Sequence, residues 1–280
     1  MKAAAIQMRS CTRVDHNLRA ARALLEEAAS RGAELAVLPE YFALMGHSDR
    51  DKLAAQETFA DGPVQQWMAQ AARELGLWLA GCLPISCTPP QEQRVINTLL
   101  IYNPQGQHVA RYDKIHLFKF DDGTHVYDEA ATLAPGSQPA LFDLPSRDGH
   151  TWRVGLSICY DLRFPELYRT LSAQGAEVLL VPSAFTFVTG KAHWSTLLRA
   201  RAIENLCALI AAAQGGVHEN TRRTWGHSML IGPWGNILAE KGEEPGVAVA
   251  ELDASELAAC RTRLPALQHR VLSQIVPKGE

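Results

Sequence analysis

The stretch from Trp152 to Leu167, WRVGLSICYDLRFPEL, constrains the fold more than any other part of the chain. Val154–Ile158 is a short, mostly apolar run typical of a buried strand, and the helical spacing that follows, with Pro165 in the first turn, predicts a helix. Cys159 lies at the junction. Backbone N–H groups at such a junction point into a crevice, so a cysteine there is a candidate thiolate nucleophile. Free cysteines also pack in cores without a chemical role, so the assignment depends on the rest of the chain.

Strands and helices alternate through the first eighty residues. Apolar runs predict buried strands, and apolar positions three or four residues apart predict the helices between them. In order, we expect a strand at 3–7, a helix that Asp15 caps and that runs to Ser30, a strand at 35–38, a helix from Gly62-Pro63 to Leu75, and a strand at 77–80. This alternation is typical of an α/β fold.

From residue 94 onward, hairpin signals interrupt this alternation. The turn Asn103-Pro104-Gln105-Gly106 separates expected strands at 95–102 and 108–112. Residues 114–136 show little periodicity, and an ordered loop of that length is usually functional. Beyond Cys159 we expect strands at 177–181, 207–212, 225–231, 237–240 and 246–252, a helix at 192–205, and a last helix capped by Asp253. We find no repeat or linker, and therefore predict one domain over residues 1–270 with a C-terminal tail over 271–280.

Charge and composition narrow the classes of function. The chain has 27 Lys and Arg against 30 Asp and Glu, without a long run of either sign, which argues against nucleic-acid binding or a polybasic membrane patch. We see no signal peptide and no run of eighteen apolar residues, and therefore expect a cytoplasmic protein. The six cysteines form no CxxC pair and the ten histidines are dispersed, so we predict free thiols, no metal and no cofactor. The expected partner is a small molecule.

Glu40 and Lys114 each follow an expected strand, as Cys159 does. Open α/β sheets place their ligands at such strand ends, so the three side chains are predicted to converge. A cysteine that attacks a carbonyl needs a base for its proton and a donor for the oxyanion. With reference pKa values of about 8.5 for cysteine and 4.3 for glutamate, that proton transfer is uphill by about 6 kcal/mol. Burial of Glu40 and the nearby Lys114 ammonium would have to offset most of this.

Four strings, which span nearly the whole chain, carry a family resemblance: LAVLPEY, YDKIHLF, ICYDLRFPELY and PSAF…GKAHW…RARAIEN…WGHSMLIGPWG. They resemble the nitrilase superfamily of carbon–nitrogen hydrolases, and within it the Nit branch, most closely the deaminated glutathione amidases, with the ω-amidases as near relatives. The resemblance implies a four-layer α-β-β-α sandwich that forms a homodimer or higher homo-oligomer, with the stretch from Leu252 to Val271 packed across the subunit boundary. The alternation of strands and helices alone predicts a simple doubly wound sheet. The resemblance changes this expectation, because the hairpins then belong to one of two stacked sheets.

The resemblance also implies catalytic roles. The family's Glu-Lys-Cys triad corresponds to Glu40, Lys114 and Cys159. Its second glutamate precedes TLxPG, here YDEAATLAPG, which places it at Glu129, next to Asp128. Glu129 would orient the lysine. The implied reaction is hydrolysis of a small carboxylate-bearing amide, most like deaminated glutathione, to an acid and ammonia through a thioester.

Four further residues are candidates for substrate binding. The backbone N–H of Tyr160 would join Lys114 in holding the oxyanion. Related N-carbamoyl amino-acid hydrolases place an arginine four residues past the nucleophile on the substrate carboxylate, which corresponds to Arg163. A structural salt bridge with a neighbouring acid is the alternative for this arginine. Phe185 and Thr186 would wall the pocket, or Phe185 would only pack in the core.

Several other functions stay open from the sequence. An ω-amidase acting on 2-oxoglutaramate, an N-carbamoyl amino-acid hydrolase and a nitrilase share the same triad. A catalytically idle binding or scaffold subunit is the non-enzyme alternative. A serine hydrolase is disfavoured, because Cys159 and Leu230 stand where the GxSxG motif requires its last glycine.

Overall fold

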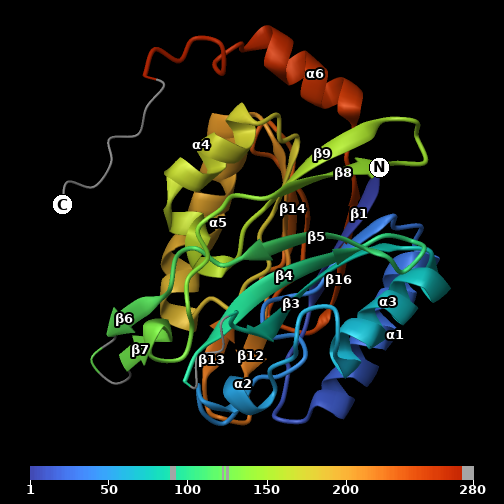
Figure 1. Cartoon of the computed structure of the whole chain (residues 1–280). Helices are drawn as coiled ribbons and strands as arrows, with labels where there is room; N and C mark the ends of the chain where they lie inside the picture. The colour runs from blue at the N-terminus through green and yellow to red at the C-terminus, as the bar shows by residue number, and fades with distance from the viewer. Residues whose placement is uncertain (89–92, 122, 124–125, 273–280) are drawn as a thin grey trace.

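Two six-stranded sheets form the centre of the computed structural model, which describes residues 1–88, 93–121, 123 and 126–272 (Figure 1). The strand order of the first sheet is β16 (Gly246–Glu251), β1 (Lys2–Gln7), β2 (Leu35–Val37), β3 (Trp78–Ser86), β4 (Val95–Tyr102) and β5 (His108–Asp113). The order of the second is β15 (Ile237–Glu240), β14 (Met229–Ile231), β11 (Ala208–Ala211), β10 (Val178–Leu180), β9 (Thr151–Leu156) and β8 (Leu141–Pro145). In each sheet three neighbouring strands run parallel, β1-β2-β3 in the first and β9-β10-β11 in the second.

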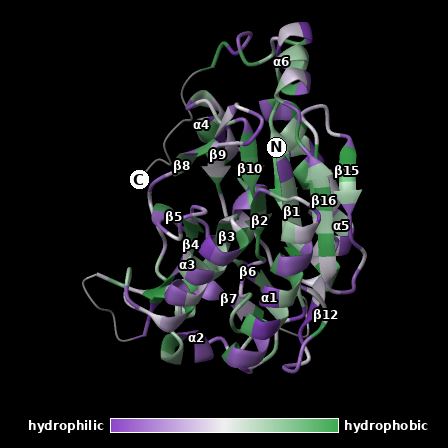
Figure 2. Cartoon of the chain, turned by 90° about the vertical axis from the view of Figure 1, so that its right-hand side faces the viewer, coloured by the Kyte–Doolittle hydropathy of each residue, from purple (hydrophilic) through white to green (hydrophobic). Residues whose placement is uncertain are grey.

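The side chains of β1 show how the layers are stacked. Ala4 and Ile6 lie in a core shared with helices, whereas Ala3 and Ala5 lie in the core shared with the second sheet. Successive residues of a strand face opposite sides, so the first sheet is covered on both faces. The helices form the outer layers: α1 (Val14–Ser30) and α3 (Pro63–Leu75) on the first sheet, α4 (Pro165–Ala173) and α5 (Phe187–Asn205) on the second. Figure 2 shows hydrophilic residues on the outward side of α1. The fold is thus the four-layer α-β-β-α sandwich, and the prediction is confirmed.

Short elements gather at one end of the sandwich, the lower end in Figure 1. They are α2 (Asp51–Ala54), β6 (Lys119–Asp121), β7 (Val126–Asp128), β12 (Gly215–Val217) and β13 (Arg223–Trp225). Two 3₁₀ helices, η1 (Glu129–Ala131) and η2 (Cys159–Arg163), follow β7 and β9. The prediction of an irregular loop over 114–136 was therefore wrong in part, because the β6–β7 hairpin and η1 lie within it. Helix α6 (Ala254–Arg263) lies at the opposite end of the molecule.

Helix starts were predicted unevenly. Those of α3, α4 and α6 are confirmed, and the Asp253 carboxylate accepts a hydrogen bond from the backbone of Ser255 at the start of α6. The cap at Asp15 was wrong, because this residue lies inside the first turn of α1 and pairs with Arg19 at 2.9 Å. Helix α5 begins at Phe187 rather than near residue 192, since the Thr186 side chain caps it.

The expected strand at 225–231 was also wrong. Trp225 ends β13 and Met229 begins β14, because Gly226 and His227 between them adopt φ angles of 73° and 56° that no strand contains. Strand β8 was not predicted. It is only five residues long, and its place beside β9 comes from antiparallel pairing between Leu141–Pro145 and Thr151–Gly155.

The end of the chain bears on the predicted tail. The described part stops at residue 272, so positions 273–280 of the tail lie outside it. Within the described ranges, no helix combines the length and apolar character needed to cross a bilayer.

Candidate active site

A buried lysine lies between two glutamates near the ends of three segments of the chain. Lys114 directly follows β5, Glu40 lies shortly after β2, and Glu129 opens η1. The Lys114 Nζ is 2.9 Å from Glu40 Oε1 and 2.7 Å from Glu129 Oε2. Both Lys114 and Glu40 are almost fully buried, with 0% and 1% of their surface exposed. The predicted lysine and both predicted glutamates are therefore one ion cluster.

Neutral donors complete the environment of Glu40. Its Oε1 accepts a hydrogen bond from Asn97 Nδ2 at 2.8 Å, besides that of Lys114. Its Oε2 accepts from the backbone N–H of Ala184 at 3.0 Å. Asn97 belongs to the first sheet, whereas Ala184 follows β10 of the second. The carboxylate is thus held from both sheets, which fixes its orientation.

Glu129 is held in the same way. Its Oε2 accepts from the backbone N–H of Phe118 at 2.8 Å, and its Oε1 accepts from the Tyr41 hydroxyl at 2.9 Å. The neighbouring Asp128 turns outward and pairs with the exposed Lys119 at 2.9 Å. Of the two adjacent acids, Glu129 alone reaches Lys114, as expected from the family resemblance.

Cys159 lies at a tight turn between β9 and η2. Its φ of 48° is in the left-handed region, which non-glycine residues rarely occupy and which is common at functional turns. The backbone N–H of Cys159 donates to Pro182 O at 3.0 Å. Asp161 closes the turn, since its carboxylate accepts from the Ile158 N–H at 2.8 Å and the Tyr112 hydroxyl at 2.7 Å. These contacts hold the turn in its strained conformation.

The charges of the cluster set the protonation states at rest. Burial raises the pKa of the Cys159 thiol well above its usual range, and Glu40 raises it further, while Lys114 opposes this. Burial alone lowers the pKa of Lys114, but the carboxylates of Glu129 and Glu40 outweigh it and keep that pKa well above its usual range. Burial raises the pKa of Glu129, yet Lys114 brings it below the usual value. The resting site therefore holds an ammonium and a neutral thiol, and a base must take the thiol proton during any attack.

Glu40 and Cys159 line one pocket, which we call the inner pocket. Its other lining residues are Phe118, Glu129, Tyr160, Arg163, Ala184, Phe185, Thr186, Thr189 and Arg222. All four predicted substrate-binding residues are among them. Tyr160 lies in the first turn of η2, where a backbone N–H has no partner within the helix. No group of three His, Cys, Asp or Glu side chains suited to a metal ion lies in the described part of the chain.

Arg163 faces the pocket without a carboxylate partner. Among the described residues it forms no ion pair, so the structural salt bridge considered for it is not observed. The neighbouring Asp161 is engaged by backbone and by the His116 ring at 2.7 Å. The Arg163 guanidinium lies 5.5 Å from the centre of the Phe185 ring and contacts His193 Nδ1 at 3.3 Å. Its charge is available to an anionic ligand.

Several residues of the site were not predicted from the sequence, and Asn97, Thr189 and Arg222 are three of them. Asn97 interrupts the apolar run of β4, and a buried amide in such a run could have been noticed. Thr189 contacts Thr186 through its hydroxyl at 2.8 Å. Arg222 comes from the β12–β13 connection, and no periodicity or motif marks it. Its place in the inner pocket depends on the packing of distant segments.

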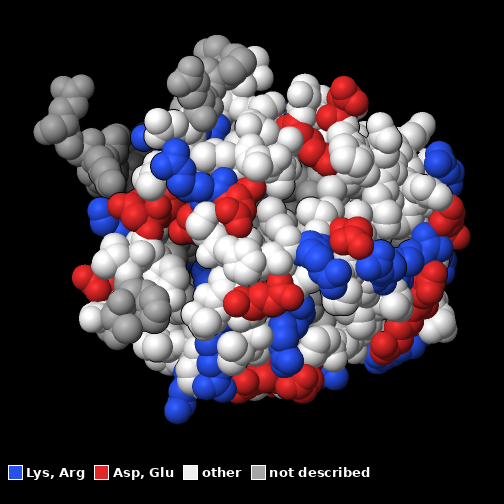
Figure 3. Space-filling model, turned by 90° about the horizontal axis from the view of Figure 1, so that it is seen from below, with Lys and Arg blue, Asp and Glu red and all other residues white. Residues whose placement is uncertain are grey.

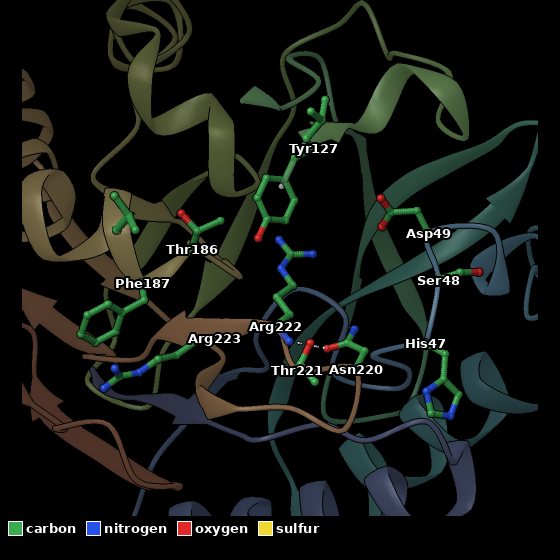
Figure 4. Close-up of a pocket in the computed structure, with 12 residues that line it drawn as sticks. His47, Ser48, Asp49, Tyr127, Thr186, Phe187, Asn220, Thr221, Arg222 and Arg223 are labelled. Atoms are coloured by element: carbon green, nitrogen blue, oxygen red, sulfur yellow. Dashed lines mark hydrogen bonds between the residues drawn. The ribbon is translucent and has the colours of Figure 1, made fainter. Parts of the chain in front are cut away.

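A larger cavity of about 620 Å³, the outer cavity, adjoins the inner pocket and shares Thr186 and Arg222 with it (Figure 4). It is lined by residues 47–49, 126–127, 186–188 and 220–223. These segments belong to the lower end of Figure 1, which Figure 3 views directly. In that view, basic and acidic side chains are interspersed. The pocket that Glu40 and Cys159 line thus adjoins a larger cavity.

Comparison with known proteins gives consistent results. A model of the carbon-nitrogen hydrolase family matches residues 2–262. The deaminated glutathione amidase of Synechocystis sp. is 45% identical over 271 residues, which cover 96% of this chain and 97% of that protein. The crystal structure of the C. elegans NitFhit protein aligns with a TM-score of 0.86 and 36% identity, over 96% of this chain and 65% of that one. A mutant amidase from Nesterenkonia sp. AN1, solved with acrylamide added at its active site cysteine, aligns with a TM-score of 0.76 and 30% identity, over 95% and 98% of the two chains.

Proposed function

The chain belongs to the carbon–nitrogen hydrolase family, and from this premise we propose that it is a cysteine-dependent amidase whose substrate is deaminated glutathione. The observation that carries the proposal is the Lys114 ammonium, held at 2.9 Å by Glu40 and at 2.7 Å by Glu129. Glu40 lines the same pocket as Cys159. A base and a thiol that line one pocket, with a cation bound to the base, are what acyl transfer to sulfur requires.

The acylation step begins with proton transfer. Glu40 takes the proton of the Cys159 thiol as the sulfur attacks the amide carbonyl carbon and the S–C bond forms. The carbonyl oxygen becomes an oxyanion, to which the Lys114 ammonium and the backbone N–H of Tyr160 donate. Glu40 then delivers its proton to the amide nitrogen, the C–N bond breaks, and the amine leaves a thioester on Cys159.

Deacylation repeats these roles with water. Glu40 takes a proton from a water molecule that attacks the thioester carbonyl, and the same donors hold the second oxyanion. The S–C bond breaks, a carboxylic acid is released, and the sulfur recovers its proton from Glu40. Glu129 acts through Lys114, which it orients and keeps charged, so it is a positioning residue.

The substrate proposal depends on the charge in the inner pocket. Arg163 would pair with the carboxylate of the 2-oxo acid end, while Phe185 and Thr186 confine the chain that leads to the amide. The similar protein of Synechocystis sp. is named for the hydrolysis of the same substrate. An unsubstituted amide would release ammonia. In deaminated glutathione the nitrogen belongs to the cysteinylglycine half, so the amine released is cysteinylglycine.

A substrate panel tests the proposal. The purified protein is incubated with deaminated glutathione, 2-oxoglutaramate, an N-carbamoyl amino acid and a nitrile, and the acid and amine released are measured. We expect kcat/KM for deaminated glutathione to exceed that for each other compound by about tenfold or more. A much faster reaction with 2-oxoglutaramate would instead indicate an ω-amidase. No turnover of any compound, together with no labelling of Cys159 by iodoacetamide, would favour the scaffold subunit.

We further propose a cytoplasmic homodimer or higher homo-oligomer built from a single domain over residues 1–270, with the stretch from Leu252 to Val271 packed across the subunit boundary. Family resemblance supports this assembly. Analytical ultracentrifugation of the whole chain, compared with a chain ending at residue 251, tests it. The proposal predicts that only the whole chain sediments as an oligomer.

A further inference from the structure

The outer cavity is positioned to receive the part of a substrate that lies beyond the scissile amide. Its volume of about 620 Å³ is within the range of small-molecule sites. It shares Thr186 and Arg222 with the inner pocket, so the two spaces adjoin at these residues. If the acyl half of the substrate binds in the inner pocket, the amine half can bind in the outer cavity.

Arg222 is the cation that both spaces share. Figure 4 shows its side chain extending toward Tyr127, with Thr186 on one side and Asp49 on the other. The guanidinium carbon lies 5.2 Å from the centre of the Tyr127 ring, and Nη2 donates to Ala184 O at 3.4 Å. The Nε is buried, and no described residue accepts a hydrogen bond from it. A buried guanidinium donor without an acceptor is unfavourable, and it becomes favourable when an anion binds.

The other charges of the outer cavity are already engaged within the protein. Arg223 Nη2 pairs with the Glu243 carboxylate at 3.1 Å, and its guanidinium lies 3.5 Å from the centre of the Phe187 ring. Asp49 Oδ1 lies 3.6 Å from the Lys52 ammonium. Among the charged side chains that line this cavity in the described ranges, Arg222 is therefore the one with a buried donor that has no acceptor.

The backbone also fixes the position of Arg222. Its N–H donates to Asn220 Oδ1 at 3.0 Å, and Asn220 Nδ2 donates to Gly46 O across the cavity wall. The connection between β12 and β13 is thereby attached to the segment that precedes α2. A guanidinium presented from an anchored connection loses little conformational entropy when it binds a carboxylate.

We propose that the outer cavity binds the amine half of the substrate and that Arg222 pairs with a free carboxylate on that half. This inference rests on the proposed function and extends it, because it defines the substrate class as amides with a carboxylate on the leaving group as well as on the acyl group. In deaminated glutathione, that carboxylate is the one that ends the glycine. Arg163 and Arg222 then each recognise one end of the substrate.

The test compares deaminated glutathione with its glycinamide analogue, in which the terminal carboxylate is a neutral carboxamide. In the wild type we expect kcat/KM to be about 10- to 100-fold higher for the acid, the factor that one charge-assisted hydrogen bond provides. In Arg222→Gln the ratio should fall to within about threefold of one, and Arg222→Lys should restore part of it. The matched control Arg223→Gln should keep the wild-type ratio, because the Arg223 guanidinium is paired with Glu243.

The ratio is measured within each protein sample, so partial loss of folded enzyme cancels. If Arg222→Gln is inactive with both compounds, the test uses the wild type alone. The measurement is then how strongly each amine product inhibits the hydrolysis of 2-oxoglutaramate. Cysteinylglycine should then inhibit about tenfold or more better than cysteinylglycinamide. Equal rates with acid and carboxamide in the wild type, or an unchanged ratio in Arg222→Gln, would overturn the inference and leave the proposed function standing. If the wild type hydrolyses neither deaminated glutathione nor its glycinamide analogue, both the inference and the proposed function are wrong.

Discussion

The ion cluster of Lys114, Glu40 and Glu129 and the outer cavity differ in how their charges are satisfied. In the cluster the Lys114 ammonium contacts both Glu40 and Glu129, and backbone or neutral side chains occupy the remaining carboxylate positions. In the outer cavity Arg222 keeps a buried donor without an acceptor among the described residues. The comparison separates two tasks. Preset charges suit a reaction whose transition state develops charge at a fixed place, whereas an open donor suits recognition of a ligand that brings its own charge.

The same contrast predicts different kinetic signatures. A change in the paired cluster removes stabilisation of the transition state, so it should lower kcat. A change at an open cation removes an interaction made with the ground state and the transition state alike, so it should mainly raise KM. Four substitutions distinguish these two signatures, from the largest expected effect to the smallest.

Glu40→Gln should have the largest effect of these four substitutions. The amide keeps the size of the side chain, and its single oxygen can still accept the hydrogen bond of Lys114 at the Oε1 position, but the side chain cannot take the thiol proton. We expect kcat to fall by about 10³-fold or more, with KM changed much less. The measurement is steady-state kinetics with deaminated glutathione, with circular dichroism as the control for folding. A kcat within about tenfold of the wild type would remove Glu40 as the base.

Glu129→Gln should have a smaller effect with a distinctive pH dependence. Glu129 and Glu40 outweigh the effect of burial and raise the pKa of Lys114. Without the Glu129 charge the Lys114 pKa falls, so the ammonium is lost at a lower pH and the alkaline limb of the kcat profile moves down. We expect kcat near neutral pH to fall by about 10- to 100-fold, or about 1.4 to 2.7 kcal/mol. An alkaline limb that stays in place would mean that Glu129 does not keep Lys114 charged.

Arg163→Lys should act on binding. A lysine keeps the charge but loses the planar fork that fits a carboxylate. KM for a 2-oxo acid amide should rise by about tenfold, with kcat changed by less than about threefold. Arg199→Lys is the matched control, because the Arg199 Nε donates to the Gly235 carbonyl, away from the inner pocket. If both variants raise KM equally, Arg163 has no special role in recognition.

Tyr41→Phe should have the smallest effect of the four. It removes one hydrogen bond, 2.9 Å long, to a Glu129 carboxylate that keeps its contacts with Lys114 and the Phe118 N–H. A loss of about 1 kcal/mol corresponds to a fall in kcat of about fivefold. A fall as large as that for Glu129→Gln would show that Tyr41 takes part more directly.

The sequence predicted the groups that follow strands, because a strand end fixes where a side chain emerges. Glu40, Lys114 and Cys159 were found in this way, and family motifs added Glu129. Periodicity alone could not choose between Asp128 and Glu129, since one residue decides whether a side chain reaches Lys114 or the exposed Lys119. Here the resemblance supplied what local patterns lack.

Contacts between distant segments were beyond local patterns. Asn97 meets Glu40 across 57 positions of the chain, and Ala184 meets it across 144. Likewise, the strand order that places β16 beside β1 follows from pairing between segments near the two ends of the chain. The role of Arg222 could not be predicted for the same reason, because the lack of an acceptor for its buried Nε depends on how distant segments pack around it.

The central claim is that Cys159 is the nucleophile of amide hydrolysis, and its most direct test is the turnover of Cys159→Ala. The initial rate of acid release from the best substrate of the panel is compared with that of the wild type at equal concentrations of folded protein. We expect a rate at least about 10⁴-fold lower, because Cys159 is the one cysteine that lines the inner pocket in the described part of the chain. A rate within about tenfold of the wild type would contradict the claim.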